Sequence, residues 1–284
     1  MEIRPTAAAD LPAQFAVFRE AIGELFRRHR FAPPDPPYEV FEAQQSHLLA
    51  HDGDRCFVVL DRGRVVGYSA ALARGETWHL ASLFVHPGQQ ARGLGRALLE
   101  QSWGGPYARR LTLTDSIQPV SNGLYGRAGL IPATPVLSLA GRAPAASGAV
   151  PLRAAAPDPT TLARLDRDAY GFDRAVDHAY WSTHASCTVW LSAAGAVAYA
   201  YTWPEGRIGP LAARDAESAA DALRAELGRA DGRPRHLLVP GSSAALAGAA
   251  LAAGLRIVGP PGLLLLSRGV APPAGLALSS FTLL

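Results

Sequence analysis

Apolar and polar residues follow one another along the chain in a pattern that predicts the same order of strands and helices twice. Short apolar runs bounded by turn residues are typical of strands, and longer stretches with one apolar face are typical of helices. In the first half the pattern predicts strands at 2–5, 56–60, 64–73, 78–85, 110–115 and 134–140, and helices at 10–29, 37–51, 93–103 and 119–128. This β-α-(α)-β-β-β-α-β-α-β order indicates a mixed α/β (α+β) fold.

The second half repeats short segments of the first in the same order and at a nearly constant offset. The paired segments are 3–8 with 152–156, 19–23 with 167–171, 56–60 with 187–191, and 128–130 with 253–255. Four similar segments that recur in the same order and at a nearly constant spacing indicate an internal duplication. The small-residue stretch Gly141 to Val150 (GRAPAASGAV) has the composition of a linker. We therefore predict two domains, 1–142 and 150–284.

Composition sets broad limits on function. The 284 residues suffice for two domains, and 49% hydrophobic content gives ample material for cores. The net charge of +3 suits a phosphate-bearing ligand but is too small to indicate nucleic-acid binding. All basic residues except histidines are arginines, so modification of the chain's own lysines is excluded. No signal core and no membrane-spanning apolar run is found, which predicts a cytoplasmic protein without membrane contact.

Residues 83–99, LFVHPGQQARGLGRALL, point most directly to chemistry. An apolar strand ends at Val85, a turn with spaced glycines follows, and an amphipathic helix then begins. Glycines let the backbone approach a bulky anion, and the turn N–H groups with the positive helix end suit phosphate oxygens. Arg92 and Arg96 add positive charge. The segment is neither a nucleotide P-loop, since no Gly-Lys-Ser/Thr follows, nor a Rossmann fingerprint, since the first glycine is absent.

This segment resembles the acetyl-CoA signature of the GCN5-related N-acetyltransferase (GNAT) superfamily, whose pyrophosphate loop reads Gln/Arg-x-x-Gly-x-Gly/Ala. With the duplication, the resemblance implies two tandem acyl-CoA N-acyltransferase-like domains, each a mixed, splayed central sheet flanked by helices. It implies acetyl-CoA as co-substrate, with pyrophosphate on the loop and pantetheine along the strand ending near Val85. The cofactor-binding residues implied are Leu83, Phe84, Val85, Gln90, Ala91, Arg92, Gly93, Leu94, Gly95, Arg96, Asn122 and Tyr125.

A second element supports the same resemblance. Residues 121–130, SNGLYGRAGL, resemble the family's Asn-x-x-aliphatic/Tyr-x-x-x-Gly-Phe element, with Leu130 in place of the usual Phe. The resemblance implies that the phenol of Tyr125 is the general acid that protonates the departing sulfur, and that Asn122 contacts the cofactor. The alternative role for Tyr125 is an aromatic side chain packed at a helix end.

The general base is the less defined part of this prediction. In the family a glutamate about six residues before the valine of the Val-x-Pro element activates the amine through water. Counting back from Val85 leads to His79, whose reference pKa of about 6.5 lets it accept a proton near neutral pH. Glu76 and Ser82 are alternative candidates, and His79 is otherwise a hydrogen-bonded strand residue.

The second half lacks these features at the corresponding positions. Residues 209–218, GPLAARDAES, stand in place of the phosphate loop, without spaced glycines and with Asp215 and Glu217 where phosphates need positive charge. Ala250 stands in place of Tyr125. We predict a degenerate domain that shapes the substrate cleft or holds the architecture.

The sequence thus predicts a GNAT-type enzyme that transfers acetyl by direct attack of a primary amine of a small molecule or peptide. The alternative is a non-catalytic acyl-CoA-binding sensor or regulator. Antibiotics, amino acids, polyamines and peptide N-termini are all open as acceptors, as are acyl length and oligomeric state. His47 and His51 lie at i, i+4, but no third ligand stands at motif spacing, so no metal is predicted. Cys56 and Cys187 occupy equivalent strands and are expected to be buried free thiols.

Overall fold

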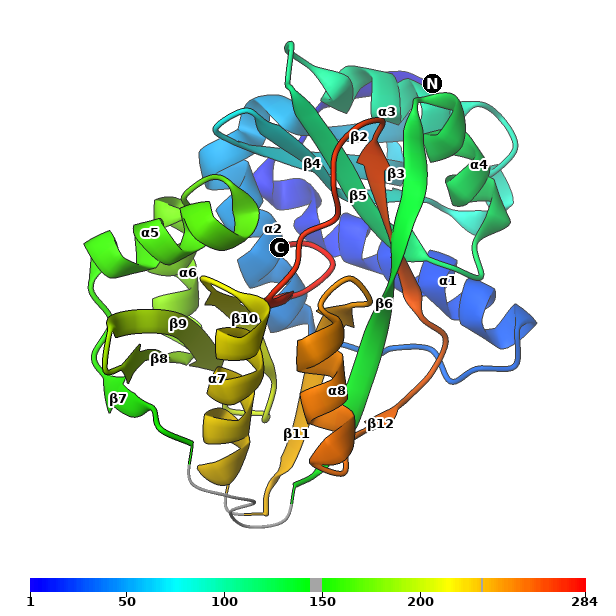
Figure 1. Cartoon of the computed structure of the whole chain (residues 1–284). Coiled ribbons are helices and arrows are strands. Elements are labelled where there is room, and N and C mark those ends of the chain that lie inside the picture. Colours follow the sequence, from blue (N-terminus) through cyan, green and yellow to red (C-terminus); the bar gives the residue numbers. More distant parts are fainter. Residues whose placement is uncertain (144–149, 231) are drawn as a thin grey trace. The chain divides into compact units, whose positions relative to one another are not determined.

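The computed structural model describes residues 1–143, 150–230 and 232–284 (Figure 1). The chain divides into two structural units, each with its own core. Unit 1 comprises Met1–Ile131 with Leu266–Arg268, and unit 2 comprises Pro132–Leu265 with Gly269–Leu284. Among the described residues, no helix is long and apolar enough to cross a membrane.

The elements of unit 1 follow the predicted order. They are β1 (Glu2–Pro5), α1 (Leu11–Arg28), α2 (Tyr38–Asp52), β2 (Cys56–Asp61), β3 (Arg64–Arg74), β4 (Thr77–Val85), α3 (Leu94–Trp103), β5 (Arg109–Asp115) and α4 (Pro119–Arg127), with short 3₁₀ turns at Ala8–Asp10, Gly53–Arg55 and Pro87–Gln89. β6 (Leu130–Arg142) begins in unit 1 and continues in unit 2. Each predicted element is present, and its ends lie within a few residues of the predicted ones.

Unit 2 repeats this order and adds short strands at its end. Its elements are β7 (Arg153–Ala155), α5 (Pro159–Tyr170), α6 (Ala175–His184), β8 (Ser186–Ser192), β9 (Gly195–Thr202), β10 (Ile208–Ala213), α7 (Ala216–Gly228), β11 (Pro234–Pro240), α8 (Ala244–Ala252), β12 (Arg256–Ile257), β13 (Gly262–Ser267, whose last residues belong to unit 1) and β14 (Leu276–Ala277). In the C-terminal segment, Leu276–Ala277 pairs with β10 as a short antiparallel strand.

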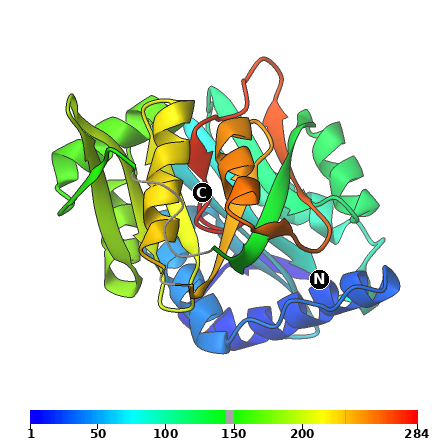
Figure 2. The ribbon, with the colours of Figure 1, turned by 60° about the horizontal axis from the view of Figure 1, so that its bottom comes forward.

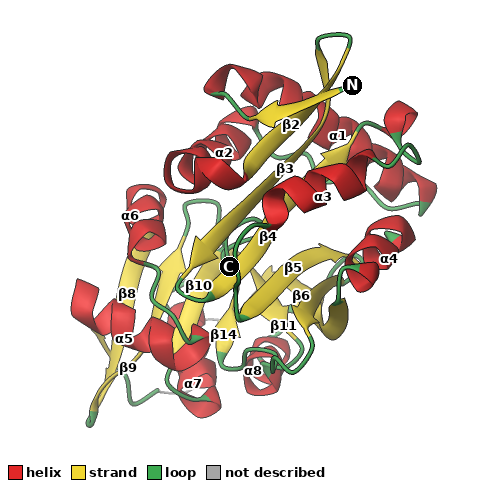
Figure 3. Ribbon diagram, turned by 90° about the horizontal axis from the view of Figure 1, so that it is seen from above, coloured by secondary structure: helices red, strands yellow, loops and turns green. Residues whose placement is uncertain are grey.

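The strands of unit 1 lie in the order β1-β2-β3-β4-β5. The first four are antiparallel, whereas β4 and β5 are parallel and paired only over 77–80 with 109–112. Figure 3 shows α3 lying along β3 and β4. Side chains of α3 pack with valines of β2–β4 in one cluster, and α1 and α2 pack aromatic side chains against the same strands in another. Because α3 and the α1–α2 pair cover different faces, the open edge of β4 beyond Leu80 lies between them.

A β-bulge interrupts β4 at this point. Ala70 of β3 is paired with Ser82, but the next residue, Ala71, is paired with Leu80, so Ala81 is an extra residue on β4. A bulge bends a strand and increases its twist. The bulge coincides with the end of β4–β5 pairing, and the two strands diverge from there, as the predicted splayed sheet requires.

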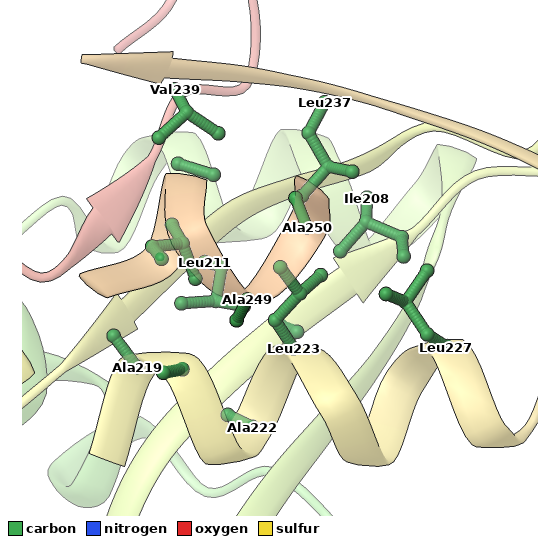
Figure 4. Close-up of a cluster of buried hydrophobic side chains, with 14 of the residues drawn as sticks. Ile208, Leu211, Ala219, Ala222, Leu223, Leu227, Leu237, Val239, Ala249 and Ala250 are labelled. Carbon is green, nitrogen blue, oxygen red and sulfur yellow. The ribbon is translucent and has the colours of Figure 1, made fainter. Parts of the chain in front are cut away.

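Unit 2 contains a five-stranded sheet in the order β14-β10-β9-β8-β7, and its strands β13, β6 and β11 are also neighbours, with β12 on β6. Helices α7 and α8 lie side by side (Figure 2) and supply small side chains to the core. Figure 4 shows Leu223 and Leu227 of α7 against Ile208 of β10 and Leu237 of β11, all buried. Alanines dominate the two helices because close helix contact leaves little room for larger side chains.

The predicted mixed α/β fold with a repeated order of elements is therefore confirmed. The predicted domain limits, 1–142 and 150–284, stay a prediction, because residues 144–149 of the expected linker lie outside the described residues. The repeat itself is visible in detail: Cys56 is the first residue of β2, and Cys187 is the second residue of β8.

Candidate active site

The predicted phosphate loop connects β4 to α3, as expected. After Val85 the chain forms a 3₁₀ turn over Pro87–Gln89, and α3 begins at Leu94 with Gly93 as its N-cap residue. Gly93 has φ +79°, a left-handed conformation that a side chain disfavours. Ala91 also lies in this region, with φ +61°. The two left-handed residues turn the chain sharply into the start of α3.

Side chains of the loop hold its shape. The Gln90 amide donates a hydrogen bond to the Val85 carbonyl at 3.0 Å, which ties the loop back to the end of β4. The Gln89 amide donates to the Asp61 carboxylate at 3.3 Å, and Arg92 donates to the Gln89 side-chain oxygen. Gln90, predicted as a pyrophosphate ligand, thus also has a structural role that sequence reasoning missed.

The first helical N–H groups remain available to a ligand. The first intrahelical bond of α3 runs from the Ala97 N–H to the Gly93 carbonyl at 3.1 Å. The N–H groups of residues 93–96 precede it and so have no partner within the helix. The loop is exposed at Arg92 and Arg96, while Leu94 is buried in the α3 core. Four N–H groups, a helix dipole and two guanidinium groups together favour a diphosphate.

The open edge of β4 supplies the second part of the predicted cofactor site. Leu83, Phe84 and Val85 follow the bulge and stay paired with β3, but β5 pairs with β4 only as far as Leu80, so the β5 side of this segment is open. Leu83 and Val85 pack toward α3, whereas Phe84 packs with aromatic residues of α1 and β3. Gly95 lies over this edge: a Cβ there would meet Leu83 and Leu124 side chains at 3.6 Å, an ordinary contact. The residues present therefore fit an extended ligand chain, such as the expected pantetheine, that runs from the loop along β4.

Helix α4 brings the predicted acid close to the turn after β5. Tyr125 is 4% exposed, and burial raises the pKa of its phenol well above the usual range, with the Ser121 hydroxyl opposing the shift. The buried phenol is neutral at neutral pH and so carries the proton that a general acid transfers. The Asn122 amide donates to the carbonyls of Asp115 and Ser116 at 3.5 and 3.4 Å. Its buried oxygen has no hydrogen-bond partner among the described residues, so it can accept from a ligand.

The three candidate bases lie on or next to β4. His79 is fully buried and stands in the segment that is still paired with β5, opposite Leu111. Ser82 follows the bulge and accepts a hydrogen bond from the Gln45 amide of α2 at 3.3 Å. Glu76 is exposed in the turn before β4. Because of the extra residue Ala81, His79 and Ser82 point to the same face of the strand although they are an odd number of residues apart.

The second half differs at its equivalent loop, and one detail of the prediction is wrong. Residues Gly209–Ala213 do not form a loop but belong to β10, with a cis bond between Gly209 and Pro210. The apolar run Ile208–Ala213 is buried throughout, which favours strand over turn. At the start of α7, where a phosphate would otherwise bind, the Asp215 carboxylate accepts a hydrogen bond from the Ser218 N–H at 2.7 Å. This hydrogen bond holds the pKa of Asp215 below its usual range.

The remaining residues singled out in the sequence are Ala250, the His47–His51 pair and the two cysteines, and their surroundings indicate structural roles. Ala250 is fully buried in the core between α7 and α8, where no phenol would fit. The ring centres of His47 and His51 lie 4.9 Å apart in a tilted arrangement, and no cluster of three or more metal-binding side chains occurs within the described ranges. Both cysteines are free, and burial raises the pKa of each thiol to about 12. Such thiols are poor nucleophiles.

A buried ionic cluster in unit 2 was not foreseen. Asp166 of α5 is fully buried and accepts hydrogen bonds from Arg174 at 2.8 Å, from His178 at 2.9 Å and from the Tyr199 hydroxyl. Although burial opposes it, Arg174 and His178 hold the pKa of Asp166 well below its usual range. The spacing of these residues gave no signal, since they come from three separate elements. Sequence reasoning also missed Asp115, at the end of β5, whose pKa burial raises to about 6.

Comparisons with known proteins agree with this geometry. Residues 19–129 match the model of the acetyltransferase (GNAT) family. No curated protein matches the sequence. A structure from Pyrococcus horikoshii, described as that of an acetyltransferase, has a TM-score of 0.77 and 16% identity over 99% of this chain and 95% of its own.

Two further structures are similar over nearly their whole length. A GCN5-related N-acetyltransferase from Sphaerobacter thermophilus has a TM-score of 0.67 and 16% identity, covering 95% of this chain and 97% of its own. A tandem GNAT protein from the clavulanic acid biosynthesis pathway has a TM-score of 0.58 and 17% identity, covering 94% and 98%. At these identities the similarity establishes the fold, which is that of tandem proteins of this kind.

Proposed function

We propose that the chain is an enzyme of the acetyltransferase (GNAT) family, whose model matches residues 19–129, and that its N-terminal half transfers acetyl from acetyl-CoA to a primary amine of a small molecule or peptide. The family uses acetyl-CoA and acetylates amine acceptors. One observation carries the proposal: a left-handed glycine opens α3 beside the unpaired edge of β4, so diphosphate and pantetheine sites adjoin.

The loop would bind the diphosphate through the N–H groups of residues 93–96 and through Arg92 and Arg96. The backbone of Leu83–Val85 would pair with the pantetheine amides on the side where β5 no longer pairs with β4. This arrangement would hold the thioester near the bulge at Ala81, where the strands diverge. Fixing both reactants in line supplies a large part of the acceleration in such reactions.

Direct transfer then needs one acid and a neutral amine. The amine nitrogen attacks the thioester carbonyl, the C–S bond breaks, and the Tyr125 phenol protonates the sulfur. His79 is the candidate base for the proton that leaves nitrogen during attack. A His79→Ala variant should lose activity over pH 6 to 9, and an unchanged rate over that range would remove His79 from the mechanism.

The second half is proposed to be a degenerate GNAT-like domain. The carboxylate of Asp215 fills the helix end that would otherwise receive a phosphate, and it would repel one. If acetyl-CoA bound to unit 2 with an affinity equal to that of unit 1, this assignment would be wrong.

The test is a thiol-release assay with acetyl-CoA and a panel of primary amines, run beside Tyr125→Phe. We expect turnover on one class of amine, and a loss of about 10² to 10⁴-fold in kcat for the variant, because general acid catalysis contributes that much. CoA affinity should change far less than kcat, since the main role of the phenol is to protonate the leaving group. CoA binding with no turnover on any amine would instead favour a non-catalytic acyl-CoA sensor.

A further inference from the structure

The side chains of β4 and β5 alternate between two faces, and paired residues share a face. Trp78 and Arg110 are paired, and the guanidinium of Arg110 lies 5.2 Å from the Trp78 ring centre. The Trp78 indole N–H donates to the Ser102 carbonyl of α3 at 2.9 Å. Even-numbered residues of β5 therefore face α3, and its odd-numbered residues, ending with Asp115, face the other side.

His79 lies on the same side as Asp115. It is paired with Leu111, an odd-numbered residue of β5, and so points away from α3. Ser82 points there as well, since the Gln45 amide of α2 donates to it. The face opposite α3 thus carries every candidate base of β4, and Asp115 adds a carboxylate to this face from the neighbouring strand.

Asp115 is fixed at the point where the two strands have already diverged. Pairing of β5 with β4 ends at Thr112, three residues earlier. The Asp115 carbonyl accepts from the Gln118 N–H at 3.1 Å and from the Asn122 amide at 3.5 Å. These bonds tie the end of β5 to α4, the helix that carries Tyr125. The backbone of Asp115 is therefore fixed to the helix that carries the proposed acid.

The carboxylate itself is uncompensated. It is partly buried, and no hydrogen bond or ion pair joins it to any described residue. Burial is the sole cause of its raised pKa of about 6. The titratable or charged groups on the adjoining elements are His79 on β4, Arg109 on β5, and Tyr125 and Arg127 on α4, and none of them contributes to the shift. A half-buried carboxylate without a protein cation favours a cationic ligand.

We propose that the carboxylate of Asp115 binds the ammonium group of the acceptor and takes its first proton. The inference rests on the proposed function and narrows the acceptor to amines that arrive protonated. An ammonium ion cannot attack a thioester, because its nitrogen has no free electron pair. Asp115 supplies both the attraction that brings the cation in and the site to which its proton goes.

The protons balance as follows. The ammonium nitrogen passes one proton to the Asp115 carboxylate, which releases it to solvent. The neutral nitrogen forms the C–N bond while the C–S electron pair leaves with sulfur, and sulfur takes the phenol proton of Tyr125. The second nitrogen proton passes to the base, and exchange with solvent restores the base and the phenol. Each turnover yields amide, free thiol and one released proton.

The experiment compares wild type, Asp115→Asn and Asp115→Glu, with Asp54→Asn as control. Asp54 is an exposed carboxylate paired with Arg55 and is remote from the proposed chemistry in sequence and role. The substrates are the alkylamine that turns over best and its weakly basic fluorinated analogue, which is largely neutral at pH 7. CoA affinity is measured for each protein, and kcat/KM for each amine is measured from pH 5 to 9.

We expect Asp115→Asn to lose about 100-fold in kcat/KM for the alkylamine, less than tenfold for the fluorinated amine, and nothing in CoA affinity. The acidic limb of the wild-type profile near pH 6 should vanish in Asp115→Asn and persist in Asp115→Glu. Equal losses on both amines, a retained limb, or a parallel fall in CoA affinity would overturn the role of Asp115 alone. No turnover by wild type on any amine would overturn the proposed function and this inference together.

Discussion

The buried cluster of unit 2 permits a sharp test of what stabilises that unit, through Asp166→Asn. The fully buried carboxylate accepts from Arg174, His178 and Tyr199, so the substitution leaves the Arg174 cation without its counter-charge. Breaking a buried ion pair by removing one partner costs about 3–5 kcal/mol. For a unit of this size each kcal/mol lowers Tm by about 2–4 °C. The expected loss in Tm is therefore roughly 6–20 °C.

The matched control is Asp168→Asn on the same helix. Asp168 pairs with Arg164 at 3.3 Å, but both side chains are 40% or more exposed. Such a pair contributes about 0–1 kcal/mol. The assay is thermal unfolding followed by tryptophan fluorescence, because Trp181 is buried beside His178. Equal midpoints for the two variants would refute the argument that burial makes the Asp166 cluster strong.

The pH dependence of this difference has a definite sign. The pKa of Asp166 is lower in the folded state than in the unfolded chain, where Asp titrates near ~3.9. The carboxylate therefore contributes its full stability above that value and loses it as pH falls toward the folded-state pKa. The stability gap between wild type and Asp166→Asn should be largest near neutral pH and should shrink on acidification below about pH 4. A gap that grows in acid would contradict the assignment.

Three further predictions concern the loop, a helix end and the thiols. Gly93→Ala should weaken CoA binding about tenfold, because a left-handed alanine costs about 1–2 kcal/mol; unchanged affinity in a titration would contradict the role of this turn. Arg110→Leu should destabilise unit 1 by about 2–3 kcal/mol, since its guanidinium caps the carbonyls of Trp103, Gly104 and Gly105, whereas exposed Arg64→Leu should be neutral in the same melt. The two thiols, each with a pKa raised to about 12, should resist a disulfide reagent at pH 8 until urea unfolds the chain, and rapid reaction of the native protein would show that they are accessible.

The order and limits of the elements in unit 1 were predictable because their signals are local. Apolar runs, the turn at Asp61–Gly63 and the spaced glycines before α3 each act within a few residues. The strand Ile208–Ala213 was predicted wrongly as a loop, because its glycine and proline are typical turn residues, and only burial on both faces favours a strand there. Local composition could not report that burial.

Most of the site geometry was beyond prediction because it depends on register. The bulge at Ala81 arises from how β3 pairs with β4, and nothing in the sequence of β4 marks it. Asp115 was overlooked for the same reason, since its importance comes from the divergence of β5 from β4 and from contacts with α4. The Asp166 cluster unites residues from α5, α6 and β9, which only the tertiary fold brings together.

The carboxylate that caps α7 has a consequence for how the thermal stability of each unit depends on CoA. In unit 1 the proposed diphosphate site at the start of α3 would take its anion from a ligand, and ligand binding would then add to folding stability roughly in proportion to the logarithm of the ligand concentration. In unit 2 the Asp215 side chain is an anion that is covalently part of the chain and present at every concentration. We expect saturating CoA to raise the unfolding temperature of one half only. The stability of unit 1 would then depend on ligand concentration, whereas that of unit 2 would not.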